Sequence, residues 1–263
     1  MWRTSQFFLL IGIIGACADP IQKDDLIVLT YNIRHGEGTD GVFDLDRQAR
    51  VILDSGADLV ALQEVDVCTT RASGINQAEE LARLTGMNVL FGEAIPYAGG
   101  SYGDAVLSKY PIESEMIWKL PAEPHHEDRV AVGILVTLPS GENVRFIGTH
   151  LDHTRDPSDR IRQARSIIEQ AFPVGKQIPP TLLLGDLNAE PDSEPMRALL
   201  EFFDSAAPGG LPSFPSDKPS KAIDWVLYAP TDSWEILEVH TIDEPVASDH
   251  TPLRAVLRHK PPH

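Results

Sequence analysis

The stretch TLLLGDLNAE, residues 181–190, ends a hydrophobic run with an acid and an amide. Three consecutive leucines at 182–184 are typical of a strand that is buried on both faces. Asp186 and Asn188 follow at the point where such a strand leaves the core. Because α/β proteins place their ligand-binding groups at strand ends, this stretch predicts that both residues belong to a functional site.

Three further stretches repeat this pattern of an apolar run that ends in a polar side chain, and two more complete the set of strand-edge segments. They are TYN at 30–32, LQE at 62–64, GTH at 148–150, IDWV at 223–226 and SDH at 248–250. If the strand ends meet, side chains from the whole length of the chain form one cluster that is rich in oxygen atoms. Such a cluster suits a hard metal ion and a phosphate group.

In this order the six motifs resemble those of the endonuclease/exonuclease/phosphatase family, which includes DNase I-like nucleases, abasic-site endonucleases, sphingomyelinases and inositol polyphosphate 5-phosphatases. The resemblance covers roughly residues 26–257. It implies a DNase I-like α/β fold, a four-layer α/β sandwich of two packed mixed β-sheets flanked by helices. It also implies a metal-dependent phosphoester hydrolase with its site at one edge of the sheets.

The resemblance assigns the metal site to three residues. Glu64 would bind the ion, with Asn32 beside it and Asp249 approaching it. Mg²⁺ is the expected ion, because it prefers oxygen ligands and usually binds one or two carboxylates together with substrate phosphate and water. Mn²⁺ is the expected substitute.

The resemblance also implies the catalytic roles. Asp224 would orient His250 as an acid/base dyad, since a carboxylate favours the protonated form of a neighbouring imidazole. Asp186 would align or deprotonate the attacking water, and Asn188 would donate an amide hydrogen to a phosphate oxygen. His150 would stabilise the pentacoordinate phosphorus or assist the leaving group.

Four residues near the motifs are candidate contacts to the substrate phosphate. Arg34 stands where some nucleases of the family place an acid, which leaves the number of metal ions open. Arg71 and Arg129 are candidates because guanidinium binds phosphate oxygens bidentately, although an ordinary salt bridge is the alternative for each. Asp104 lies in a segment where other family members often present an asparagine.

Zinc is the alternative metal, because His150, Asp152 and His153 are closely spaced. Zinc prefers histidine and cysteine, whereas the motifs offer mainly oxygen atoms, and the sequence contains neither HExxH nor CxxC. Cys68 has no nucleophilic context, so we expect a buried, inert thiol.

The chain is strongly acidic, with a formal net charge of −17 from 22 Lys and Arg against 39 Asp and Glu. Such a surface repels polyanions, which disfavours long duplex nucleic acid as a substrate. The expected substrate is therefore a small or lipid-headgroup phosphodiester, and the expected state is a monomer. An extracellular nuclease is one alternative, and a binding lipoprotein without catalysis is another.

The N-terminus carries an export signal. Arg3 precedes an apolar run at 7–14, and the sequence IGAC at 14–17 resembles the lipobox of a bacterial lipoprotein. We expect residues 1–16 to be a signal peptide, Cys17 to be lipidated, and residues 17–25 to form a short tether to one catalytic domain at 26–263. The product would be an exported, membrane-anchored lipoprotein in the periplasm or at the cell surface, and an ordinary secretory signal is the alternative.

The periodicity of the chain predicts a mixed α/β domain. A strand, helix and strand are expected within residues 26–62, with the helix at 44–55, and further helices at 77–84, 157–172 and 194–203. Strands are expected at 104–108, 129–138 and 143–149. Two Pro-rich segments, 119–128 and 207–221, are either substrate-selecting loops at the catalytic rim or plain surface connections.

Overall fold

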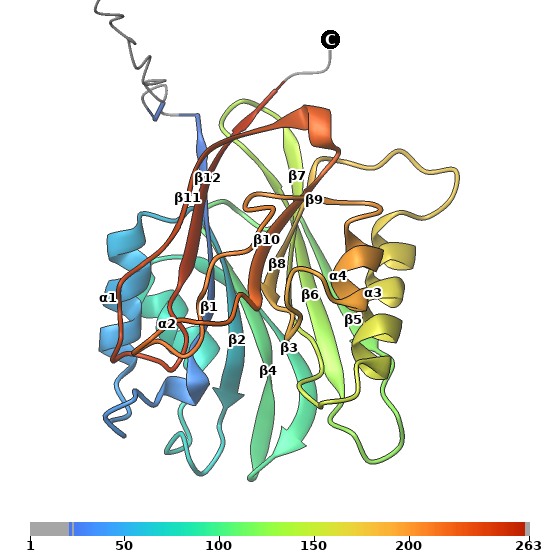
Figure 1. Cartoon of the computed structure of the whole chain (residues 1–263). Helices are drawn as coiled ribbons and strands as arrows, with labels where there is room; N and C mark the ends of the chain where they lie inside the picture. The colour runs from blue at the N-terminus through green and yellow to red at the C-terminus, as the bar shows by residue number, and fades with distance from the viewer. Residues whose placement is uncertain (1–20, 23, 261–263) are drawn as a thin grey trace, which may run out of the picture.

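Two six-stranded mixed β-sheets pack face to face in this computed structural model, which describes residues 21, 22 and 24–260 (Figure 1). The first sheet has the spatial order β11 (Trp234–Thr241), β12 (Leu253–His259), β1 (Leu26–Asn32), β2 (Leu59–Val67), β4 (Gly100–Ser108) and β3 (Asn88–Tyr97). The second has the order β5 (Ser114–Leu120), β6 (Arg129–Thr137), β7 (Asn143–His150), β8 (Thr181–Asp186), β10 (Asp224–Ala229) and β9 (Asp204–Ser205).

Helices cover the outer face of each sheet. The helices α1 (Leu45–Ser55) and α2 (Gln77–Thr85) lie against the first sheet, and α3 (Ser158–Ala171) and α4 (Glu194–Leu199) lie against the second (Figure 1). Two short 3₁₀ turns, at Arg34–Gly36 and Thr231–Ser233, complete the helical elements of the described residues. The arrangement confirms the expected four-layer α/β sandwich.

The strand β8 shows how the layers are held together. Leu182 and Leu184 belong to the core between the two sheets, whereas Leu183 belongs to the core beneath α3 and α4. Successive side chains of a strand point to opposite faces, so a strand that is covered on both faces must be apolar throughout. β8 pairs with β7 in parallel and with β10 antiparallel, which makes it the interior strand that its leucines predict.

The helix ends follow local capping chemistry. The side chain of Asp44 accepts a hydrogen bond from the backbone N–H of Arg47 at 2.9 Å, and Gly56 ends α1 with a left-handed φ of 70°. The expected helix at 194–203 ends earlier, at Leu199. The chain turns there, so that the ring of Phe203 packs edge-on against Phe172 with centroids 5.0 Å apart.

The N-terminal expectations fall mostly outside the described residues. The predicted signal peptide and Cys17 both lie there, and the first described strand, β1, begins at Leu26. Among the helices of the described chain, none is long and apolar enough to span a membrane.

Candidate active site

The polar ends of the six motifs meet at one edge of the two sheets. A cavity of about 610 Å³ opens at this edge. Its lining includes six of the eight predicted metal and catalytic residues, Glu64, His150, Asp186, Asn188, Asp249 and His250. Asn32 and Asp224 are buried and bonded to members of that set.

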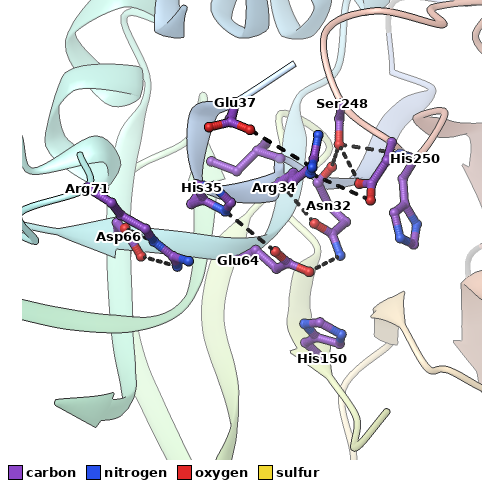
Figure 2. Close-up of polar contacts among 12 residues, drawn as sticks. Asn32, Arg34, His35, Glu37, Glu64, Asp66, Arg71, His150, Ser248 and His250 are labelled. Atoms are coloured by element: carbon purple, nitrogen blue, oxygen red, sulfur yellow. Dashed lines mark hydrogen bonds and ion pairs between the residues drawn. The ribbon is translucent and has the colours of Figure 1, made fainter. Parts of the chain in front are cut away.

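Asn32 connects the two sheets at the site. Its Nδ2 donates hydrogen bonds to Glu64 Oε1 at 3.0 Å and to Asp186 Oδ2 at 3.2 Å, and Figure 2 shows it beside Glu64. The hydroxyl of Ser248 donates to the backbone carbonyl of Asn32 at 2.7 Å. The first, second, fourth and last motifs are therefore joined by direct contacts around one fully buried amide.

The backbone turns Glu64 toward the cavity. The register between β2 and β4 shifts between Leu62 and Val65, so that two residues of β2 stand opposite the single residue Asp104. Glu64 has a φ of 60°, which is strained for a residue other than glycine. Such bulges redirect side chains next to active sites, and this one presents the carboxylate of Glu64 at the sheet edge.

Asp186 lies at the centre of the site. Its Oδ2 is 3.4 Å from His150 Nε2 and 3.6 Å from His250 Nε2. Burial, and then the neighbouring charge of Asp224, raise the pKa of Asp186 to about 7. A carboxyl group with a pKa near neutrality is suited to exchange protons with a bound water.

His250 and Asp224 form the predicted pair. His250 Nδ1 lies 2.9 Å from Asp224 Oδ2, and Ser213 Oγ donates to the same oxygen at 2.5 Å. Burial alone would lower the pKa of His250, but the carboxylates of Asp224 and Asp186 outweigh it and raise that pKa to about 10. The imidazole is therefore cationic at neutral pH.

The pKa of His150 is shifted in the opposite direction from that of His250. Burial, and then the positive charges of Arg129 and His250, hold the pKa of His150 well below its usual value, so its imidazole is neutral. Asn188 Nδ2 lies 3.0 Å from His150 Nε2 and donates to Leu151 O at 3.1 Å. Both amide hydrogens of Asn188 are thus engaged, so a donation to substrate requires one of these contacts to be exchanged.

The donor set at Glu64 fits a hard divalent ion. Glu64 and Asp249 present carboxylate oxygens to the same cavity, and Asn32 lies between Glu64 and Asp186. His35 Nδ1 is 4.0 Å from Glu64 Oε2, and burial is the main factor that lowers the pKa of His35, so it adds no positive charge there. Oxygen donors of this kind are the ligands that Mg²⁺ and Mn²⁺ prefer.

Two other groups of side chains have metal-like spacing in the described part of the chain. Asp186, Asp224 and His250 form one group. The imidazole of His250 is cationic, and a histidine must be neutral to bind a metal ion, so this group is not the metal site. The other consists of His126, Asp152 and Asp159, whose carboxylates pair with Arg160 and Arg162. The zinc alternative named His150, Asp152 and His153, which form no metal-like group among the described residues.

Arg129 and Arg34 lie near the site. Arg129 lines the cavity, with its Nη2 2.9 Å from His153 Nδ1 and 3.1 Å from Glu127 Oε1. Arg34 Nε is 3.8 Å from Asp249 Oδ2. A phosphate contact remains a prediction for both.

Arg71 and Asp104 differ from the expectation. The guanidinium of Arg71 is bound by Asp66, with Nε–Oδ2 at 2.6 Å and Nη2–Oδ1 at 2.9 Å (Figure 2). Asp104 is buried behind the bulge and does not line the cavity, and burial raises the pKa of its carboxyl to about 8. Arg71 thus forms the salt bridge that was the alternative, and the carboxylate of Asp104 is hydrogen-bonded by the backbone of His150.

Cys68 also differs from its prediction, because its side chain is exposed and not buried. It follows β2 with a left-handed φ of 57°, which ends the strand and turns the residue outward.

Both Pro-rich segments border the cavity. Ser213 and Phe214 from residues 207–221 contact the dyad: Ser213 bonds Asp224, and the Phe214 ring lies 4.8 Å from that of His250. Glu127 from residues 119–128 lines the cavity beside Arg129. These residues show no hydrophobic periodicity, and only their proline content distinguishes the two segments in the sequence.

Comparison with known proteins identifies the chain. The sequence pattern of the Endonuclease/Exonuclease/phosphatase family matches residues 29–250. The chain belongs to this family. Endonuclease/exonuclease/phosphatase proteins are metal-dependent phosphoester hydrolases, so this protein is an enzyme of that class.

Solved structures of the endonuclease/exonuclease/phosphatase family share the fold. A family protein from Bacteroides vulgatus is 22% identical, with 90% of this chain and 100% of that chain covered and a TM-score of 0.73. A mannosyl-6-phosphatase from Bacteroides thetaiotaomicron is 16% identical, with 89% and 99% covered and a TM-score of 0.69. The human nocturnin catalytic domain with bound sulfate is 18% identical, with 91% and 96% covered and a TM-score of 0.70.

Proposed function

We propose that this enzyme hydrolyses a small phosphodiester, such as that of a lipid headgroup, with Mg²⁺ as its metal ion and Mn²⁺ as a substitute. The observation that carries the proposal is the single cavity into which Glu64, Asp186 and His250 all project. Carboxylates for an ion, a carboxyl group with a pKa of about 7 and a cationic imidazole are together what phosphoester hydrolysis requires.

Glu64 would hold the ion, with Asn32 beside it and Asp249 approaching it, and the ion would supply positive charge to the phosphate oxygens. Asp186 accepts the proton of the attacking water while the new P–O bond forms and the bond from phosphorus to the alcohol oxygen breaks, and the departing alkoxide takes up a proton from solvent water. His250, oriented by Asp224, places its positive charge on the phosphoryl oxygens, where negative charge develops.

His150 and Asn188 complete the phosphate contacts. The neutral state of His150 favours a hydrogen-bonding role over proton donation to the leaving group. Asn188 reaches a phosphate oxygen when substrate replaces its contact with His150.

The volume of the cavity and the net charge of the protein both support a small substrate. A cavity of about 610 Å³ lies within the range of small-ligand sites. A net charge of −17 disfavours long nucleic acid, which leaves a nuclease as the second candidate. A phosphomonoester of a sugar is a further candidate, because one protein of the same fold is a mannosyl-6-phosphatase. A binding protein without catalysis fits least, because none of the eight predicted metal and catalytic residues has been lost.

The proposal includes a location. Cleavage before Cys17 and acylation of its thiol and amine would anchor the enzyme to a membrane outside the cytoplasm, as a monomer that acts on nearby headgroups.

A substrate panel tests the function. Purified protein is assayed with Mg²⁺ and with EDTA on an aryl phosphodiester, an aryl phosphomonoester, sphingomyelin, inositol phosphates and plasmid DNA. We expect EDTA-sensitive cleavage of the small diesters and little action on plasmid DNA. Faster cleavage of DNA would favour the nuclease, and no cleavage of any ester would contradict the proposal.

A further inference from the structure

The imidazole of His35 faces Glu64, the residue assigned to the metal ion, from the 3₁₀ turn Arg34–Gly36 (Figure 2). Its Nδ1 is buried, and among the described residues this nitrogen has no hydrogen-bond partner. A buried polar atom that is left without a partner costs about 1 to 3 kcal/mol. The nitrogen therefore needs a partner from outside the protein, such as a water molecule or an ion.

The separation of His35 from Glu64 is suited to a shared ion. His35 Nδ1 lies 4.0 Å from Glu64 Oε2, which is longer than a hydrogen bond. Two ligand atoms that each lie about 2.1 Å from one ion can be at most about 4.2 Å apart. One ion therefore fits between these two atoms without a rearrangement of the backbone.

The two oxygens of Glu64 have different surroundings. Oε1 accepts a hydrogen bond from Asn32 Nδ2 at 3.0 Å, whereas Oε2 is the oxygen that faces His35. The same amide nitrogen also donates to Asp186, so Asn32 directs hydrogens, and not a ligand atom, toward Oε1. A cation on Oε1 would meet those hydrogens. Oε2 is therefore the oxygen of Glu64 that is free to bind the ion.

The backbone holds the imidazole of His35 in this position. Arg34 and His35 have left-handed φ values of 45° and 43°, which are unfavourable for residues other than glycine. Such strain is concentrated at active sites and ligand-binding sites, where the surrounding contacts enforce it. Here the fully buried Gln77 donates from Nε2 to the backbone oxygen of His35 at 2.6 Å, and its Oε1 accepts from the backbone N–H of Asp66 at 2.8 Å. The side chain is thus placed before an ion binds, which lowers the cost of binding.

His35 is also in the protonation state that a metal ion requires. Burial, and then the positive charge of Arg71, lower the pKa of His35, so its imidazole is neutral at pH 7. A histidine binds a metal ion only in its neutral form. An imidazole nitrogen is a softer ligand than a carboxylate oxygen, so it favours transition-metal ions over Mg²⁺.

We propose that His35 is a ligand of the metal ion, and that its Nδ1 and Glu64 Oε2 bind one ion between them. The inference rests on the proposed placement of the ion at Glu64, and it adds a nitrogen to a set of oxygen ligands. This nitrogen should make Mn²⁺ the more tightly bound of the two expected ions.

Mn²⁺ bound to the purified protein tests the ligand directly, because electron spin-echo spectroscopy detects a nitrogen nucleus that is bonded to the ion. The variant is His35→Asn, since asparagine tolerates a left-handed backbone and should leave the fold intact. The control is His240→Asn, which removes an imidazole outside the cavity. The wild type and the control should show the nitrogen signal. His35→Asn should lose it and bind Mn²⁺ about 10-fold more weakly or worse, with a change of less than about 3-fold for Mg²⁺.

A nitrogen signal that persists in His35→Asn would overturn the inference. Its absence from the wild type would do the same and would leave a bridging water as the partner of Nδ1. Glu64→Gln separates this result from the proposed function. If Glu64→Gln binds Mn²⁺ as tightly as the wild type does, the placement of the ion at Glu64 fails. If Glu64→Gln binds weakly while His35→Asn binds normally, only the role of His35 fails.

Discussion

The imidazole of His250 is held between two carboxylates: its Nδ1 lies 2.9 Å from Asp224 Oδ2, and its Nε2 lies 3.6 Å from Asp186 Oδ2. Ser213 bonds the same oxygen of Asp224 and fixes the carboxylate. The orientation of His250 therefore depends on Asp224, and its positive charge depends on Asp224 and Asp186 together.

The first prediction is that Asp224 and His250 act as one unit. Asp224→Asn and His250→Ala should each lower kcat/KM by roughly 10² to 10³-fold, the usual contribution of a group that stabilises charge in the transition state. The double variant should lose little more than the worse single variant, because residues that serve one step are not additive. His240→Ala, an imidazole on β11 outside the cavity, is the control. Losses that multiply in variants that remain folded would separate the pair.

The raised pKa of His250 predicts a pH dependence of stability. The folded pKa of about 10 lies above the ordinary value of 6.5, so the stabilisation is fully present below pH 6.5 and is lost as pH rises toward 10. Between pH 7 and pH 9.5 the wild type should lose on the order of 1 to 3 kcal/mol of unfolding free energy more than His250→Gln does. Urea titrations at both pH values measure the difference, and parallel curves for the two proteins would refute the linkage.

Gly185 in the GDLN motif should tolerate no side chain. A Cβ at this position would lie 1.9 Å from the backbone oxygen of Thr149 on the neighbouring strand β7. Gly185→Ala should therefore lower the unfolding free energy by about 1 to 3 kcal/mol or more, as overpacking does. Gly209→Ala, which meets no atom within 4 Å, should change it by less than about 0.5 kcal/mol. Equal stability of the two variants in thermal unfolding would contradict the packing of β7 against β8.

The proposed anchor predicts a lipid-modified N-terminus. Expression of the full chain in a bacterial host should give a form that partitions into detergent and whose mass shows acylation at Cys17, since such anchors carry more than one chain. Cys17→Ser should remain in the aqueous phase. An intact, unacylated N-terminus in mass spectrometry would rule out the anchor.

The motifs predicted the site most directly where they end a strand with a strong pattern, as at Asn32, His150 and Asp186. Asp224 instead begins β10, and the SDH motif lies in the segment before β12. Leu182–Leu184 and the strand before Asn32 are apolar on both faces, and their polar ends had no role in a core. The edge strands were harder to predict. β5 and β11 are largely exposed or half-buried, so their sequences carry little apolar periodicity, and β3 and β12 follow turns without a clear signal.

The residues that surround the motifs depend on tertiary contacts that no local pattern encodes. Ser213 reaches Asp224 only because residues 207–221 fold back over the dyad, and Glu127 reaches the cavity from a proline-rich loop. The guanidinium of Arg71 could bind a phosphate, but it forms a salt bridge with the buried carboxylate of Asp66, five residues earlier in the chain. Cys68 was expected inside because cysteine is usually buried, yet the strand ends just before it.

The most direct test of the account is the metal dependence of Glu64→Gln. Hydrolysis of an aryl phosphodiester is measured against Mg²⁺ concentration for the wild type, Glu64→Gln and Glu115→Gln, an exposed acid on the edge strand β5. Loss of even an outer contact to a bound metal typically costs 10- to 100-fold in affinity, so removal of a charged ligand should raise the half-maximal Mg²⁺ concentration at least 10-fold. Glu115→Gln should follow the wild-type curve. A Glu64→Gln curve identical to that of the wild type would contradict the placement of the metal ion and the mechanism built on it.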